Sequence, residues 1–220
     1  MLTAVLIPAR NEGPRLAEVL AEVRRVQPQA QLWVIDGQSQ DDTVQVAQAC
    51  GAQVLQQAGK GYAAALATGY QALANSGVER AVQLDADGQH PPAAIPRLLR
   101  CLDQADLVFA SRQGTSSGGP WSRRAGNAAL AAVVRQRTGL DLHDVMSGFW
   151  ATNAHAIQTL AQILAPGCAD ANVRIASWRA GLRLHEAPVA MPERSGGHSM
   201  HQGWAGARNF ALSLWAAGEA

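Results

Sequence analysis

Short apolar runs typical of buried strands alternate with helix-like segments through the first half of the chain, and this alternation constrains the fold most. Strands are expected over five ranges: Thr3–Pro8, Gln31–Asp36, Ala52–Gln56, Glu79–Asp85 and Asp106–Ser111. Helices are expected between them at Glu12–Val26, from Asp41 or Asp42 to Cys50, at Ala63–Ala74 and at Pro92–Leu102. Strands separated by helices of this length predict an α/β fold whose mostly parallel central sheet is covered by helices on both faces.

The second half of the chain is less regular. Two helices and a strand are expected at Trp121–Arg137, Asp170–Ala180 and Leu182–Val189, and mixed strand and helix signals run from Trp150 to Leu164. Two polar, Gly-containing segments, Gln113–Pro120 and Glu193–Gly203, are expected to be flexible loops. Gly203–Ala217 is expected to form a terminal amphipathic helix. It would pack on the sheet or on a second subunit, or lie on a membrane surface.

Charge and cysteine content exclude several classes of protein. Lys and Arg number 18 against 17 Asp and Glu, a balance that offers no bulk attraction to nucleic acid. No apolar run reaches the roughly twenty residues of a membrane-spanning helix. The first residues lack the basic leader and cleavage site of a signal peptide. The 3 cysteines form no CxxC pair, so no zinc cage is expected. We expect a reduced, cytoplasmic protein.

Polar and charged residues follow four of the expected strands directly. They are the sequences PARNE from Pro8, DGQS from Asp36, DADGQH from Asp85, and Ser111 with Arg112. In a parallel α/β sheet, ligands bind at the carboxyl ends of the strands. The clustering therefore predicts a binding site along one edge of the sheet.

The sharpest of these features is Asp85-Ala86-Asp87. Two carboxylates one residue apart at a strand end can turn towards one hard cation, and oxygen ligands suit Mg²⁺ or Mn²⁺. Such a metal would neutralise a diphosphate leaving group. The alternative is that the two acids cap the following helix and solvate the surface.

Three further features indicate a phosphorylated ligand, each with a plainer alternative. Asp36 can accept a hydrogen bond from a ribose hydroxyl or a base N–H, or can simply form a turn. Gly59-Lys60-Gly61 can present backbone N–H groups and a cation to phosphate, or only start a helix. Arginines in or beside the two expected loops can clamp phosphate or remain solvated; they are Arg112, Arg123, Arg124 and Arg194.

Several common site types are not supported. Tyr62 follows Gly61, which breaks the Walker A pattern, and no G-x-G-x-x-G follows the first strand. Ser39 has no paired histidine, so a hydrolase triad is not expected.

Taken in order, the motifs resemble those of the family 2 glycosyltransferases. They are PARNE, VIDGQSQDDT, GKGYAAALATGY, QLDADGQHPP, ASR, DVMSGFW, and HEAPV followed by ERSGGHS. The branch most similar is that of the polyprenol-phosphate, or dolichol-phosphate-mannose-synthase-like, enzymes. The resemblance implies a GT-A fold, a nucleotide-diphosphate-sugar donor of the GDP-mannose or UDP-glucose type, a divalent metal (Mg²⁺ or Mn²⁺) and inversion at the anomeric carbon.

The resemblance also implies roles for individual residues. It puts Pro8, Arg10, Glu12 and Asp36 in the nucleoside pocket, although Arg10 stands where the family usually has Tyr. It implies that Asp85, Asp87 and Gln89 bind the metal and the diphosphate, and that the Ala86 backbone contributes to the same pocket. It places Arg112 and Arg124 near the sugar or acceptor phosphate, Asp144 on the acceptor side and Arg194 at the diphosphate. A catalytic domain over residues 1–202 would divide into a nucleotide-binding half to about residue 112 and an acceptor half, followed by the helix at 203–220.

The acceptor decides whether the protein must supply a base. A lipid monophosphate is already anionic at neutral pH and needs none. A hydroxyl acceptor needs a carboxylate within hydrogen-bond reach, for which Asp144 is the first candidate and Asp170 the second. Peripheral contact with the inner face of a membrane and a homodimer are both compatible with the sequence. A sugar nucleotidyltransferase and a non-catalytic nucleotide-sugar-binding scaffold are the competing functions.

Overall fold

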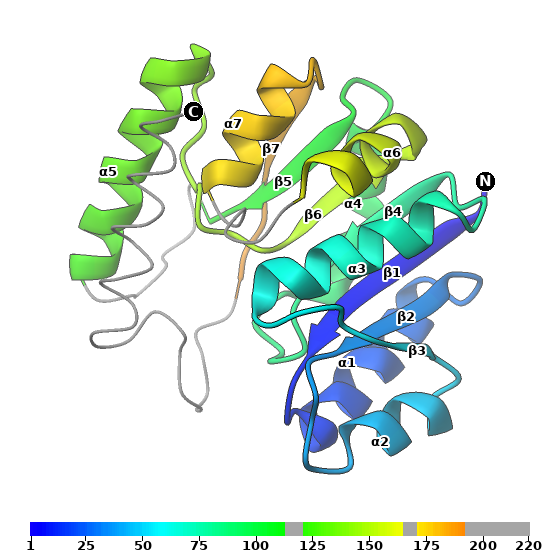
Figure 1. Ribbon diagram of the computed structural model, residues 1–220. Helices are drawn as coiled ribbons and strands as arrows, with labels where there is room; N and C mark the ends of the chain where they lie inside the picture. The colour runs from blue at the N-terminus through cyan, green and yellow to red at the C-terminus, as the bar shows by residue number, and fades with distance from the viewer. Residues whose placement is uncertain (113–120, 165–170, 192–220) are drawn as a thin grey trace.

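The computed structural model describes residues 1–112, 121–164 and 171–191. The expected loops at 113–120 and 193–203 and the expected terminal helix at 203–217 lie outside these ranges. Figure 1 shows a central sheet with helices packed on both of its faces.

The five strands expected in the first half are confirmed, with ends shifted by at most a few residues. The seven strands that the structure describes are β1 (Thr3–Ala9), β2 (Gln31–Asp36), β3 (Gln53–Gln56), β4 (Arg80–Gln83), β5 (Leu107–Ser111), β6 (Trp150–Asn153) and β7 (Leu184–Pro188). The described helices are α1 (Gly13–Val26), α2 (Thr43–Ala49), α3 (Tyr62–Ala74), α4 (Ile95–Cys101) after a 3₁₀ turn at Pro92–Ala94, α5 (Trp121–Thr138), α6 (Ala154–Ile163) and α7 (Ala171–Arg179).

The strands form one sheet in the order β3-β2-β1-β4-β6-β5-β7. Every neighbouring pair is parallel except the two pairs that involve β6, which runs against both β4 and β5. The expectation of a mostly parallel α/β sheet is therefore confirmed. The chain moves outwards from β1 to β2 and β3, and then returns through α3 to β4 on the other side of β1, so the strand order reverses between β1 and β4.

The mixed signals after Trp150 belong to a strand and a helix with no loop between them. Asn153 ends β6, and its side-chain oxygen accepts a hydrogen bond of 2.9 Å from the Ala156 backbone N–H at the start of α6. One residue thus closes the strand and caps the helix. Overlap of the two periodicities follows from this direct junction.

Alternation along the strands divides the core into two layers. Val5, Ile7 and Ala9 of β1 face α1 and α4, whereas Ala4 and Leu6 face α3 and α6. A third, smaller cluster joins α5 and α7 to the segment between α5 and β6, through Leu130, Val134, Leu142, Val145 and Ile175. The third cluster attaches the segment at 140–146 to the outer helices.

Of the two acids expected at the start of α2, Asp41 binds its first backbone N–H group. Asp42 is the N-cap residue, but its side chain makes no capping hydrogen bond. The neighbouring Asp41 instead accepts from the Thr43 backbone N–H at 3.0 Å and from the Thr43 hydroxyl. The hydroxyl bond lowers the pKa of Asp41.

A buried carboxylate ties β5, β6 and β7 together at the amino end of β5. The Asp106 side chain accepts from the Arg183 backbone N–H at 2.9 Å, from Arg183 Nε and Nη2 at 3.0 Å each, and from Asn153 Nδ2 at 2.8 Å. Hydrogen bonding to the Arg183 side chain holds the pKa of Asp106 well below its usual value. Asp106 is therefore a structural acid, far along β5 from the carboxyl edge.

We expect Asp106→Asn to lower the free energy of unfolding by about 1 kcal/mol, because the Arg183 backbone N–H and the Asn153 amide lose a charged acceptor, whereas the exposed Arg183 guanidinium group is solvated in its place. The carboxyl titrates lower in the folded than in the unfolded protein. Its contribution is therefore present above about pH 4 and is lost as the pH falls through the folded value. Urea denaturation at several pH values measures both effects. Asp103→Asn is the control, since Asp103 is 63% exposed where it pairs with Arg80. Equal losses of stability in the two variants would contradict the structural role of Asp106.

Candidate active site

Because β1, β2 and β4 are parallel, their carboxyl ends lie at one edge of the sheet, and the strand order reverses there between β1 and β4. Ligands of open α/β sheets bind at such switch points. The sequences predicted to carry chemistry, PARNE, DGQS and DADGQH, all leave the sheet here. The topology therefore brings these three predicted segments to one edge.

The loops after β1 and β2 are fastened to each other. Asn11 and Gln38 both have positive φ angles, 56° and 63°, which non-glycine residues rarely adopt. The Asn11 backbone N–H donates to Ser39 Oγ at 3.0 Å, and Asn11 Oδ1 accepts from the Gln40 backbone N–H at 2.8 Å. Such strained, over-determined backbone is typical of functional sites.

Asp36 lies beneath these loops and is 1% exposed. Its carboxylate accepts from the backbone N–H groups of Gln38 at 3.1 Å and Ser39 at 3.2 Å, so it forms the turn that was the plainer expectation. Of the other predicted nucleoside-pocket residues, Pro8 and Glu12 are half-buried and Arg10 is exposed. Together they border one end of β1 and β2.

Lys60 is exposed and lies between two glycines of positive φ, Gly59 at 96° and Gly61 at 87°. Gly61 is the N-cap residue of α3. The segment therefore does start a helix, and it also leaves the Lys60 ammonium group in solvent near the amino end of α3.

Asp85 is held by residues that the sequence did not single out. Its Oδ1 accepts from the Tyr62 hydroxyl at 3.0 Å, and Gln83 Nε2 donates to the same hydroxyl oxygen at 2.9 Å. The Asp85 backbone N–H donates to His90 Nδ1 at 3.0 Å, which leaves the imidazole proton on Nε2. The His90 ring stacks on Phe149 with centroids 5.2 Å apart. Asp85 thus leaves β4 in a fixed orientation.

Gly148 lies directly against this carboxylate. A Cβ atom at this position would be 2.7 Å from the Tyr62 hydroxyl oxygen and 3.2 Å from Asp85 Oδ2. Only glycine lets the chain approach so closely, which explains the glycine in the DVMSGFW motif.

The turn after Asp85 contains the other predicted metal ligands. Asp87 is half-buried and its Oδ1 accepts from the Gln89 backbone N–H at 3.0 Å, while Ala86 is buried and Gln89 half-buried. Within the described ranges, no three His, Cys, Asp or Glu side chains gather closely enough to hold a metal by themselves. Two carboxylates and an amide oxygen fit Mg²⁺ or Mn²⁺ only if water or phosphate oxygens complete the ligand set.

Arg112 and Asp144 form an ion pair at the end of β5. Asp144 accepts from Arg112 Nε at 2.6 Å, Arg112 Nη2 at 2.8 Å and the Arg112 backbone N–H at 3.1 Å. Burial raises the pKa of Asp144, but the hydrogen bonds and charge of Arg112 outweigh burial and leave that pKa below its usual value. The same bonds raise the pKa of Arg112. The pair is charged at neutral pH.

Some predicted residues cannot be placed in the site. Arg124 is in α5, but its side chain lies outside the description, as does that of Arg123; Arg194 and Asp170 lie outside the described ranges altogether. Sequence reasoning missed Tyr62, Gln83, His90, Gly148 and Glu186. All five lie within the motifs quoted above, so the motifs indicated the right segments but not the contacts that these side chains make.

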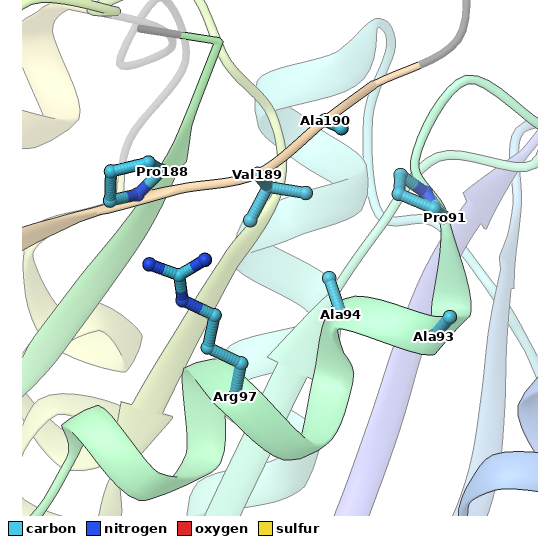
Figure 2. A pocket seen from close by; sticks show the side chains of 7 residues that line it. All are labelled: Pro91, Ala93, Ala94, Arg97, Pro188, Val189 and Ala190. Carbon is cyan, nitrogen blue, oxygen red and sulfur yellow. The ribbon is translucent and has the colours of Figure 1, made fainter. Parts of the chain in front are cut away.

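A small pocket of about 250 Å³ borders the turn on the α4 side. Figure 2 shows its apolar walls: Pro91, Ala93 and Ala94 face Pro188, Val189 and Ala190 across it. Arg97 rises from α4 with its guanidinium group directed towards Pro188 and Val189. Pro91 follows His90 directly, so the pocket adjoins the turn that carries Asp85 and Asp87.

The sheet, its switch point and the acidic turn define an α/β protein with a candidate binding edge, and sequence comparison identifies the family. Residues 4–161 match the profile of glycosyl transferase family 2. The chain belongs to this family and is a glycosyltransferase, which sets aside the nucleotidyltransferase and scaffold alternatives.

No helix within the described ranges is long and apolar enough to cross a membrane.

The relatives lie in the branch expected from the motifs. An undecaprenyl-phosphate mannosyltransferase of Micrococcus luteus is 30% identical over 92% of this chain and 88% of its own length. A polyprenol monophosphomannose synthase of Mycolicibacterium smegmatis is 29% identical over 91% of this chain and 81% of its own. Glucosyl-3-phosphoglycerate synthase of Mycobacterium tuberculosis, solved with Mn²⁺, UDP and glucosyl-3-phosphoglycerate, superposes with a TM-score of 0.71 at 22% identity, covering 99% of this chain and 80% of that one. The structural likeness confirms the GT-A fold.

We expect Gly148→Ala to lower kcat/KM at least tenfold, because the new methyl group displaces Tyr62 or Asp85. Steady-state kinetics measures the change, and urea denaturation measures stability. Gly69→Ala is the matched control: its Cβ would meet Leu6 in the core at 2.7 Å, so it should cost stability with little change in kcat/KM of the folded protein. An unchanged kcat/KM in Gly148→Ala would contradict the close approach.

Proposed function

We propose that the protein transfers a sugar from a nucleotide-diphosphate-sugar to a polyprenyl phosphate, with inversion and with a divalent metal. The observation that carries the proposal is the meeting of the turn holding Asp85 and Asp87 with the Asp144–Phe149 segment, through Gly148. The named relatives act on polyprenyl phosphates, which supports this acceptor class.

The donor would lie across the ends of β1, β2 and β4. Asp36, Pro8, Arg10 and Glu12 would contact the nucleoside, with Lys60, the Ala86 backbone and Arg194 near the phosphates. The half of the chain up to residue 112 would thus bind the donor, and residues 113–202 the acceptor.

A divalent metal would be held by Asp85, Asp87 and Gln89 together with diphosphate oxygens. Bound there, it would neutralise charge on the leaving diphosphate. The Mn²⁺ in the solved synthase supports a metal of this class. Tyr62 and Gln83 would keep the Asp85 carboxylate turned towards it.

Arg112 would bind an anionic group of the reactants, with Arg124 near it. Asp144 would position Arg112 rather than act as a base, because three hydrogen bonds from Arg112 already occupy its oxygens. An acceptor phosphate is anionic without help and attacks the anomeric carbon directly. This division of roles requires no protein base.

The pocket beside the acidic turn would take the apolar part of the acceptor next to its phosphate. Its walls are apolar, and Arg97 supplies one cation. The reaction would then occur at the cytoplasmic face of a membrane. A soluble phosphorylated acceptor is the second candidate, favoured by the phosphoglyceric acid bound in the solved synthase.

Donor binding is tested by calorimetry with UDP, GDP, CDP and TDP, with and without Mn²⁺. We expect one nucleotide to bind in a metal-dependent manner and Asp87→Asn to weaken that binding at least tenfold, because a charged ligand is lost. Asp103→Asn, an exposed acid away from the site, should bind normally. Absence of metal-dependent binding by all four nucleotides would contradict the proposal.

The acceptor pocket is tested with Arg97→Ala, which should raise KM for a polyprenyl phosphate roughly tenfold through loss of a charge-assisted contact. KM for the donor should stay unchanged. Arg100→Ala, on the same helix but outside the pocket, is the control. Equal acceptor KM values in wild type and Arg97→Ala would show that the acceptor binds elsewhere.

A further inference from the structure

We infer that Glu186 is a positioning residue for Arg112, acting through the backbone of His143 and Asp144. Its kinetic consequence rests on the proposed function, whereas its structural consequence does not. Glu186 lies in β7 and Arg112 follows β5, and the residue that connects them, Asp144, belongs to neither strand.

Glu186 is a buried acid whose bonds go to consecutive backbone N–H groups. Its side chain is 8% exposed. Oε1 accepts from the Asp144 N–H at 2.7 Å and the His143 N–H at 3.1 Å, and Oε2 accepts from the His143 N–H at 3.0 Å. Oε2 is also 3.3 Å from His143 Nδ1. A charged acceptor makes these bonds stronger than neutral ones.

The segment that Glu186 holds has no regular secondary structure of its own. Asn127 of α5 donates to the His143 carbonyl at 2.6 Å and accepts from the Val145 N–H at 3.1 Å. Arg174 of α7, fully buried, donates to the carbonyls of Asp144 at 2.9 Å and Ser147 at 3.2 Å. Side chains from three elements therefore replace the backbone ladder that would otherwise fix this turn.

Glu186 differs from Asn127 and Arg174 in the backbone groups that it binds. Its bonds fix the N–H of Asp144 itself and the N–H before it, and so the direction in which the Asp144 side chain leaves the backbone. That side chain receives both Arg112 Nε and Nη2, so its orientation sets the plane of the guanidinium group. The Arg112 side chain is 24% exposed, so part of it reaches the surface at this edge of the sheet.

Glu186→Gln is the sharpest substitution because it preserves shape and removes one acceptor. With the amide oxygen in the place of Oε1, the new NH₂ group takes the place of Oε2 and faces the His143 N–H, which lies 3.0 Å from Oε2, so that two donors meet where a charged oxygen accepted before. The turn must then shift, and the Arg112–Asp144 geometry with it.

The structural test is the set of arginine Nε–H signals in a ¹H–¹⁵N spectrum. Arg112 Nε donates to Asp144, and Arg183 Nε donates to Asp106 at the other end of β5, so the protein contains a matched reporter. Glu186→Gln should shift or broaden the Arg112 signal and leave Arg183 unchanged, and Asp106→Asn should do the reverse. An unchanged Arg112 signal in folded Glu186→Gln would overturn the inference. If that variant does not fold, Glu186→Asp, which keeps the charge and both oxygens but is shorter, is read in the same way.

The kinetic test is a double-mutant cycle with Arg112→Ala. Glu186→Gln should lower kcat/KM about tenfold in the wild type and by less than twofold once Arg112 is absent, because the two act on one interaction. Glu186→Asp should retain more activity than Glu186→Gln. Independent, multiplicative losses would overturn the inference. A wild-type protein that transfers no sugar would overturn the proposed function instead, and the Arg112 signal alone would then decide the role of Glu186.

Discussion

The reversed direction of β6 between β4 and β5 decides which residues meet at the site. Because β6 is antiparallel, its first residue, Trp150, pairs with Gln83 and Phe109 near the carboxyl ends of its two neighbours. The segment leading into β6 must therefore arrive at the same edge where β4 releases Asp85 and β5 releases Arg112. The Ala110 N–H donates to the Phe149 carbonyl at 2.8 Å and continues the pairing up to that edge. If β6 were parallel to its neighbours, the segment that follows it, rather than the segment that precedes it, would lie at this edge.

The electrostatics of the site follow from this arrangement. Asp85 is oriented by Tyr62 and approached by Gly148, whereas Arg112 is oriented by Asp144 on the other side of the same segment. Groups held in advance need little reorganisation when charge develops on a leaving group. Tyr62 and Glu186 are thus expected to affect the reaction through the residues they hold.

Sequence reasoning predicted the strands, the edge and the acidic turn because these depend on local patterns. Val5, Ile7, Leu32 and Val34, for example, belong to short apolar runs and are buried in strands, as their local pattern predicts. It did not predict the antiparallel insertion of β6, whose four residues join α6 without a loop, nor the contacts of Tyr62 and Glu186. Tyr62 lies 23 positions from Asp85 in the sequence, and Glu186 lies 43 and 42 positions from His143 and Asp144. Local periodicity does not indicate contacts over such separations. Resemblance to a family marked the segments, and only the fold shows which side chain holds which.

The proposed site places the diphosphate of the donor where the ends of β1 and β4 meet the Asp144–Phe149 segment. A crystal structure of the protein with Mn²⁺ and the preferred nucleoside diphosphate tests it most directly, because anomalous scattering locates the metal independently of the protein. We expect a metal peak within about 2.2 Å of an Asp85 or Asp87 carboxylate oxygen, with diphosphate oxygens among the other metal ligands. A nucleotide bound in the pocket beside Arg97, or a metal coordinated away from both acids, would contradict it.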